Sequence, residues 1–179
     1  VYFRPIEHGV DVSIESATKY LSGHSDVMLG TLTAATEEIY RKLKDTAGRW
    51  GNCAGPDECY LVHQGLRTLD VRLERHQRNA RILIEWLLKQ PQVERILYPA
   101  LETDPGHALW KRDFRGASGL FGLVLKEGLE AAAPRLFDRL RHFRIGSSWG
   151  GFESLLVPAW PPPRRVHRQP PEARRLLRI

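Results

Sequence analysis

The sequence of 179 residues has few of the features that mark secreted or membrane proteins. Its two cysteines, Cys53 and Cys59, are too few for a disulfide framework, and their spacing lacks the partners of a zinc site. No apolar run approaches the roughly 20 residues that a membrane-spanning helix needs. These absences argue against a disulfide-stapled scaffold and a membrane partner, and a reducing cytoplasm is the expected location.

The first residues also lack an initiator methionine and the layout of a signal peptide. We therefore expect the chain to begin inside a longer protein. Metal-binding motifs are missing as well. The seven histidines have no spacing typical of metal ligands. The sequence thus predicts no metal site.

The net charge of +6 raises the question of a nucleic-acid partner. Residues 158–179 hold six arginines and one acid, whereas the rest of the chain holds 21 basic and 20 acidic side chains, so only the tail is basic. These arginines and Trp160 could contact phosphates and stack on bases. Aromatic residues are not interleaved, however, and no nucleic-acid-binding motif occurs. We therefore favour a solvated, proline-rich loop over residues 157–171 and expect no nucleic-acid partner.

The hydrophobic pattern predicts a mixture of strands and helices. Strands are expected at residues 9–14, 27–33, 93–98, 119–125, 144–148 and 175–179. Short helices are expected at residues 37–46, 106–114 and 130–143. The strand at 27–33 is apolar enough to be buried, and Glu38 is placed to pair with Lys42.

The longest periodic element covers residues 57–89 and predicts a single helix, which Pro91 ends. Its apolar residues recur at helical spacing and should form one buried stripe. The members of this stripe are Leu66, Leu69, Leu73, Ala80, Ile84 and Leu87.

Lys19 is the residue around which the candidate chemistry is built. It follows Ser16 and Thr18 and precedes a Gly-His-Ser-Asp run at residues 23–26. A lysine amine that forms a Schiff base must lose its proton, and hydroxyls with nearby backbone N–H groups can hold a phosphate beside it. The alternative is that Lys19 is one of six solvated surface lysines. His24 could tune such a site, but a hydrogen-bonded structural histidine is the preferred interpretation.

Two motifs carry a resemblance to a known family. The first is Ser16-Ala17-Thr18-Lys19-Tyr20 with the run at residues 23–26, and the second is Ser148-Trp149-Gly150-Gly151-Phe152-Glu153-Ser154-Leu155. In this order they resemble the Cys/Met-metabolism family of pyridoxal-phosphate (PLP) enzymes. This family includes cystathionine lyases, cystathionine gamma-synthase and methionine gamma-lyase. The resemblance covers most of this chain but only the C-terminal part of the family's longer chain.

The resemblance implies an α/β fold of the aspartate-aminotransferase-like (type I PLP) class. Residues 1–56 would be the end of the large cofactor-binding domain, residues 57–90 a linking helix, and residues 91–179 a truncated small domain. The small domain is expected to contain a mainly antiparallel sheet.

The resemblance also implies roles for individual residues. Lys19 would bind PLP covalently and, once freed by the substrate amine, act as a general base. Ser16 and Thr18 would contact the cofactor phosphate. Arg178 would bind the substrate carboxylate, with the alternative that it is one of six tail arginines facing water. Ser148 and Trp149 would line the substrate pocket, with a core tryptophan as the alternative for Trp149.

Tryptophan before the paired glycines resembles the cystathionine beta-lyases within the family. The implied activity is therefore that of a carbon–sulfur lyase of trans-sulfuration and methionine biosynthesis. It would convert cystathionine, or a related cysteine S-conjugate, to a thiol such as homocysteine, pyruvate and ammonia. A gamma-lyase, a gamma-synthase, an inactive fragment or a nucleic-acid-binding module are the alternatives.

The intact enzyme is expected to be a homotetramer, a dimer of dimers. In the family, the carboxylate that pairs with the pyridinium nitrogen and the aromatic that stacks on the ring precede the lysine. Neither can be placed here, so we expect the chain alone to hold PLP poorly.

Overall fold

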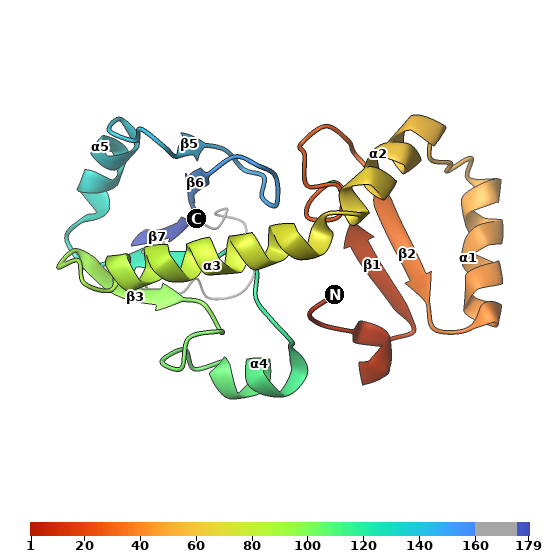
Figure 1. Cartoon of the computed structure of the whole chain (residues 1–179), viewed down its shortest axis with the longest axis horizontal. Coiled ribbons are helices and arrows are strands. Elements are labelled where there is room, and N and C mark those ends of the chain that lie inside the picture. Colours follow the sequence, from red (N-terminus) through yellow and green to blue (C-terminus); the bar gives the residue numbers. More distant parts are fainter. Residues whose placement is uncertain (160–174) are drawn as a thin grey trace. The chain divides into compact units, whose positions relative to one another are not determined.

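The structure is a computed structural model that describes residues 1–159 and 175–179. The chain forms two units, and most elements of both are labelled in Figure 1. The first unit comprises Val1–Arg72, Asp113–Arg115 and Gly150–Phe152. The second unit comprises Leu73–Arg112, Gly116–Trp149 and Glu153–Ile179. Two short pieces from late in the sequence therefore belong to the N-terminal unit.

A two-stranded sheet and two helices form most of the first unit. Its elements are the 3₁₀ helix η1 (Pro5–His8), β1 (Val12–Ser16), β2 (Gly30–Ala34), α1 (Glu37–Arg49) and α2 (Pro56–Leu66). The strands are antiparallel. The predicted pair of Glu38 and Lys42 on α1 is confirmed at 2.6 Å. Ala17, Val27 and Val62 form the buried core of this unit.

The expectation of a buried strand over residues 27–33 is wrong. Val27 is buried, but it packs in the core before β2 begins at Gly30. Within β2, Leu32 is 53% exposed. The reason is pairing: β1 ends at Ser16, which lies opposite Gly30, so the residues before Gly30 have no strand partner in β1.

The prediction of a single helix over residues 57–89 is also wrong. Two helices cover this range, because α2 ends at Leu66 and a separate helix, α3 (Leu69–Leu87), begins at Leu69. At the break, the Thr68 amide bonds to the Gly65 carbonyl three residues back. The Thr68 hydroxyl donates to the same carbonyl at 3.3 Å, and hydroxyls that bond a preceding carbonyl bend helices.

The apolar stripe itself is largely confirmed. Leu66, at the end of α2, is 46% exposed and lies outside it. The buried members, all on α3, are Leu69, Leu73, Ala80, Ile84 and Leu87.

The second unit is built on a five-stranded sheet of order β3-β4-β7-β6-β5. Its strands are β3 (Val93–Leu97), β4 (Gly122–Leu125), β5 (Arg144–Ile145), β6 (Leu155–Pro158) and β7 (Leu176–Arg178). Among these described strands only β5 and β6 pair in parallel, so the prediction of a mainly antiparallel sheet is confirmed.

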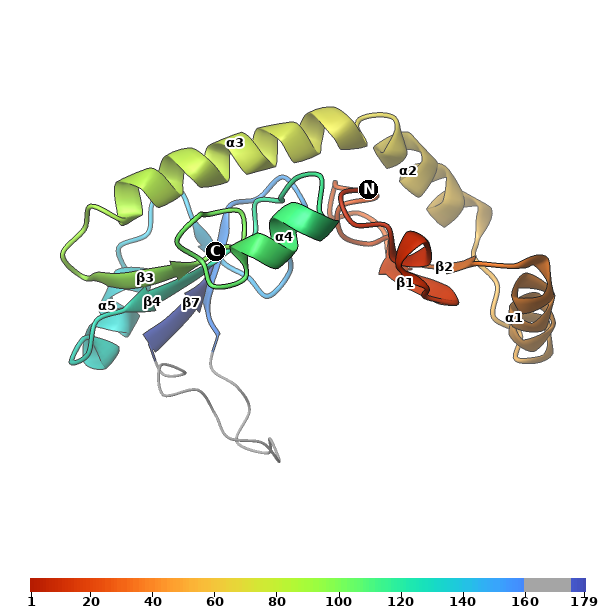
Figure 2. The same ribbon diagram turned by 90° about the horizontal axis from the view of Figure 1, so that it is seen from below.

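Helix α3 covers one face of this sheet (Figure 2). Its residues Ala80, Ile84 and Leu87 share a core with residues of β3, β4 and β7, including Ile96, Leu123 and Leu177. Burial of this apolar surface is the main force that holds helix and sheet together. The three-residue strand β7 lies between β4 and β6, so it is paired on both sides.

Three shorter elements complete the second unit, namely α4 (His107–Asp113), η2 (Glu130–Ala132) and α5 (Ala133–Phe137). The helix expected over residues 130–143 is thus too long, and Leu136, expected inward, is 38% exposed. Arg135 and Arg139 would stand four residues apart on a continued helix, and like charges at that spacing disfavour it. The strand expected at 144–148 is likewise shorter, because β5 ends at Ile145.

Strand β6 replaces the start of the predicted proline-rich loop, since it extends to Pro158. The rest of that predicted loop, from residue 160 onward, lies outside the described residues. Within the described part of the chain, no helix combines the length and the apolar character that a membrane span requires.

Candidate active site

Lys19 lies in a tight turn that directly follows β1. Its amide bonds to the Ser16 carbonyl at 3.1 Å, and its carbonyl accepts the Gly23 amide at 2.8 Å. The Ser22 amide bonds to the Ala17 carbonyl at 2.9 Å, and the Ser22 hydroxyl donates to the Thr18 carbonyl at 3.0 Å. Ser22 is almost fully buried. The backbone on both sides of Lys19 is therefore fixed, while its own side chain is half-buried.

The two hydroxyl residues before Lys19 have different surroundings. Thr18 Oγ1 accepts the Leu29 amide at 2.9 Å and lies 3.3 Å from the Leu29 carbonyl oxygen. A hydroxyl has one proton, so a phosphate at Thr18 would compete with that carbonyl for it. Ser16, the last residue of β1, is exposed.

The Gly-His-Ser-Asp run turns the chain sharply after Lys19. Gly23 has φ +73°, and Ser25 has φ +59°, which is the only positive φ at a non-glycine among the described residues. Such a conformation is costly for a residue with a Cβ and persists only where neighbouring contacts impose it. His24 Nδ1 lies 2.6 Å from the Ser22 carbonyl, which confirms the prediction of a hydrogen-bonded histidine.

Two glycines from distant parts of the sequence pack against this turn. A methyl group on Gly65 would lie 2.2 Å from the Ser22 carbonyl oxygen. A methyl group on Gly150 would lie 2.9 Å from the Tyr20 nitrogen and 3.1 Å from the Lys19 carbonyl carbon. Gly150 belongs to the second sequence motif, so the two motifs meet within the first unit.

Arg72, in the first turn of α3, also contacts the turn. Its guanidinium donates to the Tyr20 carbonyl at 2.8 Å and to the Gly65 carbonyl at 2.7 Å. Burial lowers the pKa of Arg72 below its usual value. Sequence reasoning missed Arg72 and Gly65. The one available signal was a glycine and a threonine inside a helical pattern, which indicates a break but not its contacts.

Arg178, at the end of β7, lies with Ser148 and Trp149 in the second unit. Its Nη2 donates to the carbonyl of Ser147 at 2.7 Å and is 3.3 Å from that of Ser148. Its guanidinium carbon lies 5.3 Å from the centre of a Trp149 ring, within the range of a cation–π contact. Three of the predicted site residues are thus brought together, and Arg178 is only partly exposed.

The donors of Arg178 are unequally used. The bonds to the loop carbonyls all leave from Nη2. Within residues 1–159 and 175–179, no hydrogen bond from Nε or Nη1 of Arg178 is found. One edge of the guanidinium therefore remains available for two parallel bonds to a carboxylate.

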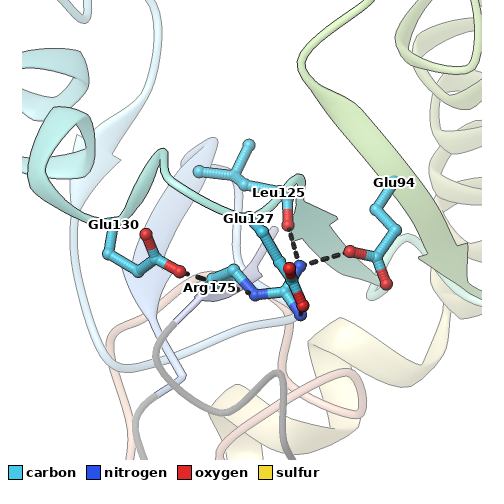
Figure 3. Close-up of polar contacts among 5 residues, drawn as sticks. All are labelled: Glu94, Leu125, Glu127, Glu130 and Arg175. Carbon is cyan, nitrogen blue, oxygen red and sulfur yellow. Dashed lines mark hydrogen bonds and ion pairs between the residues drawn. The ribbon is translucent and has the colours of Figure 1, made fainter.

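Arg175 precedes β7 and is the one buried charged side chain among the described residues, at 7% exposure. Its Nη1 donates to the Glu94 carboxylate and, at 2.7 Å, to the Leu125 carbonyl (Figure 3). Glu127 and Glu130 lie 3.8 Å and 3.7 Å from the guanidinium. The bond to Glu94 raises the pKa of Arg175, so it stays charged. Sequence reasoning counted Arg175 among the basic residues of the tail, at the start of the strand expected at residues 175–179, and missed this cluster.

The predicted site residues therefore fall into two groups. Ser16, Thr18 and Lys19 belong to the first unit, and Ser148, Trp149 and Arg178 to the second. Within the described residues no group of His, Cys, Asp or Glu side chains could hold a metal ion.

Comparisons with known proteins agree on one family. A family model described as Cys/Met metabolism PLP-dependent enzyme matches residues 1–177. Over 95% of this chain, the sequence is 49% identical to a Rhizobium johnstonii protein named "Putative cystathionine beta-lyase". Over 87% of this chain, it is 42% identical to the L-alanine/L-glutamate racemase of Wolbachia pipientis.

A solved structure gives the same result. The crystal structure of cystathionine gamma synthase from Xanthomonas oryzae is 37% identical and matches 99% of this chain with a TM-score of 0.86. The chain covers 44% and 39% of the two sequence relatives and 47% of the solved chain, so it spans less than half the length of each.

Proposed function

Since the chain belongs to the Cys/Met metabolism family of PLP-dependent enzymes, we propose that its parent enzyme is a carbon–sulfur lyase. Its substrate would be cystathionine or a related L-cysteine S-conjugate. The relative named "Putative cystathionine beta-lyase" is 49% identical to this chain. Trp149 before the paired glycines also resembles the cystathionine beta-lyases within the family. In this proposal residues 1–56 end the large domain, residues 57–90 link the domains, and residues 91–179 belong to the small domain.

Gly150 is the observation that carries the proposal. The second motif was expected to line the same site as the first, and Gly150 packs directly against the backbone of Lys19 and Tyr20. Ser148 and Trp149 immediately precede Gly150 in the chain. A side chain at position 150 would clash with the Lys19 turn, so the Gly150 segment of the second motif belongs to the packing of that turn within the first unit.

The residues around Lys19 fit PLP by their chemistry. Lys19 supplies an amine on a fixed backbone, and Ser16 supplies an exposed hydroxyl for a phosphate. Thr18 would supply a second hydroxyl by giving up its bond to the Leu29 carbonyl. When bound, PLP withdraws electrons from the substrate Cα and so makes its proton acidic. The amine of Lys19 would then accept that proton and deliver it to the departing sulfur.

Arg178 would orient the substrate by its carboxylate. The open edge formed by Nε and Nη1 can donate two parallel bonds to the two carboxylate oxygens. The bonds from Nη2 to the Ser147 and Ser148 carbonyls hold the guanidinium plane in one orientation. Trp149 would provide an apolar wall for the thioether.

The reaction in this proposal breaks the bond between Cβ and sulfur. Cystathionine and water would give homocysteine, pyruvate and ammonia. The similarity to a gamma synthase and to a racemase supports two alternatives. Both can begin with the same removal of the Cα proton by Lys19, so they differ in the later steps. In this proposal the intact enzyme is a homotetramer, in which a neighbouring subunit would contribute phosphate contacts from residues that precede Val1.

Two measurements test the proposal. For the chain of 179 residues, we would add PLP, reduce with borohydride, and map the label over the six lysines by mass spectrometry. We expect Lys19 to be labelled ahead of the other five, although an absorbance titration should show weak binding. Equal labelling of all six lysines would contradict the role of Lys19. Tight PLP binding that Lys19→Ala abolishes would contradict the expectation that this chain alone binds PLP weakly.

For the intact enzyme, the products from cystathionine identify the reaction. Pyruvate and homocysteine indicate β-elimination, whereas 2-oxobutyrate and cysteine indicate γ-elimination. Conversion of L-alanine to D-alanine without either keto acid would support the racemase alternative. Lys19→Ala should abolish whichever reaction occurs.

A further inference from the structure

Arg72 is a half-buried cation whose hydrogen bonds go to backbone carbonyls and one hydroxyl. Besides the bonds to Tyr20 and Gly65, its Nη2 lies 3.4 Å from the Leu21 carbonyl, and its Nε donates to Thr68 Oγ1 at 3.1 Å. Among the described residues no carboxylate lies within ion-pair distance of Arg72. Burying an uncompensated cation is unfavourable, so the carbonyl contacts must offset that cost.

The carbonyls that Arg72 binds complete the hydrogen bonding of the Lys19 turn. Bonds within the turn use the carbonyls of residues 16 to 19. The next two carbonyls, of Tyr20 and Leu21, point to the guanidinium instead. Buried backbone carbonyls need a donor, and here one side chain supplies it for two successive residues.

The guanidinium also packs closely against the turn at Gly23. A methyl group on Gly23 would lie 2.0 Å from Arg72 Nη1 and 2.4 Å from its Cζ. The turn is therefore enclosed by Arg72 and by the backbones of Gly65 and Gly150. Of these three contacts, only Arg72 acts through a side chain, so it can be changed without altering backbone conformation.

We propose that Arg72 is a positioning residue for Lys19. By fixing the carbonyls one and two residues after the lysine, it holds the amine in the orientation in which it meets the carbonyl carbon of the cofactor. This inference rests on the proposed role of Lys19. A planar fork is required, because an amide or an ammonium group cannot reach the Tyr20, Leu21 and Gly65 carbonyls together.

The test uses the complete chain, PLP as the probe and borohydride trapping. The other five lysines are internal standards for the reactivity of Lys19. We would compare Arg72→Gln and Arg72→Lys with Arg75→Gln, which removes an exposed arginine from the same helix. We define the Lys19 lead as the ratio of the label on Lys19 to the average label on the other five lysines. We expect this lead to fall about tenfold in Arg72→Gln, because misplacing a reacting group slows its reaction. The fall should be smaller in Arg72→Lys and absent in Arg75→Gln.

Amide hydrogen exchange on the same samples separates positioning from unfolding. A reduced Lys19 lead with unchanged protection of β2 and α2 supports the inference. An unchanged lead in Arg72→Gln overturns it. If Arg72→Gln loses amide protection throughout the first unit, the Lys19 lead is compared between Arg72→Lys and the unsubstituted chain instead. An unchanged lead in Arg72→Lys then overturns the inference. If Lys19 has no lead in the unsubstituted chain, the proposed role of Lys19 fails first, and this inference fails with it.

Discussion

At the scale of single residues, Gly150 holds the Lys19 turn by having no side chain. Its φ of +78° already disfavours other residues, and a Cβ would meet Tyr20 and Lys19 at 2.9–3.1 Å. Gly9 has a similar φ of +83° but nothing within 4 Å. We expect Gly150→Ala to lower the free energy of unfolding by about 2–5 kcal/mol, the sum of backbone strain and overpacking.

The matched variant Gly9→Ala should lower the free energy of unfolding by the backbone strain alone, about 1–2 kcal/mol. Urea denaturation of both variants gives the two values. Equal losses would mean that the close approach at Gly150 contributes nothing. The comparison isolates the contact, because both glycines belong to the first unit and differ mainly in the space around them.

The same scale shows which residues sequence could and could not predict. Lys19 and its hydroxyl neighbours form a local pattern, and the resemblance that they carry led to the family, now confirmed. Arg72 contacts residues 51 and 52 positions away, and such contacts leave no local pattern. Arg175 is charged and lies in an arginine-rich tail, and the strand expected at residues 175–179 gave no sign of its burial, which three nearby acids allow.

At the scale of elements, strand β7 depends on the cluster around Arg175. A three-residue strand is short, and slipping it by one residue would turn Arg178 to the other face of the sheet. Arg175 fixes its register by bonding to Glu94 on β3 and to Leu125 on β4. We expect Glu94→Gln to accelerate amide exchange in β7, because the buried guanidinium loses its closest counter-charge.

Glu127→Gln is the control for this prediction. Glu127 is 3.8 Å from the same guanidinium, but its side chain is 89% exposed, and exposed pairs contribute little. Exchange in β7 should therefore change little in Glu127→Gln. Equal acceleration in both variants, or none in Glu94→Gln, would contradict the view that Glu94 holds the strand.

Helix lengths were the least predictable feature at this scale. The apolar period continues across residues 66–69, so the pattern predicted one helix where α2 and α3 are separate. The break depends on Thr68 bonding the Gly65 carbonyl and on the Ser22 carbonyl approaching Gly65. The hydrophobic period indicates which face of a helix is apolar, but it does not indicate whether one helix continues or two separate helices follow each other.

At the scale of the whole molecule, each unit has its own core. Ile84 is fully buried in the core of the second unit, whereas Ile82, two residues earlier on α3, is 61% exposed. We expect Ile84→Ala to lower the free energy of unfolding by about 2–5 kcal/mol through lost burial and a cavity. Ile82→Ala should change it by less than about 0.5 kcal/mol. Thermal or urea unfolding checks both, and similar losses would contradict the placement of the core.

The interleaved order of the two units has a consequence for recombination between relatives. The chain passes from one unit to the other after residues 72, 112, 115, 149 and 152. A chimera joined anywhere between residues 73 and 149 would take the Lys19 turn from one parent and the Gly150 segment from the other. Chimeras would therefore keep the turn intact only if both parents lack a side chain at the position of Gly150. Compatibility between parents would be decided by a position that contributes no functional group at all.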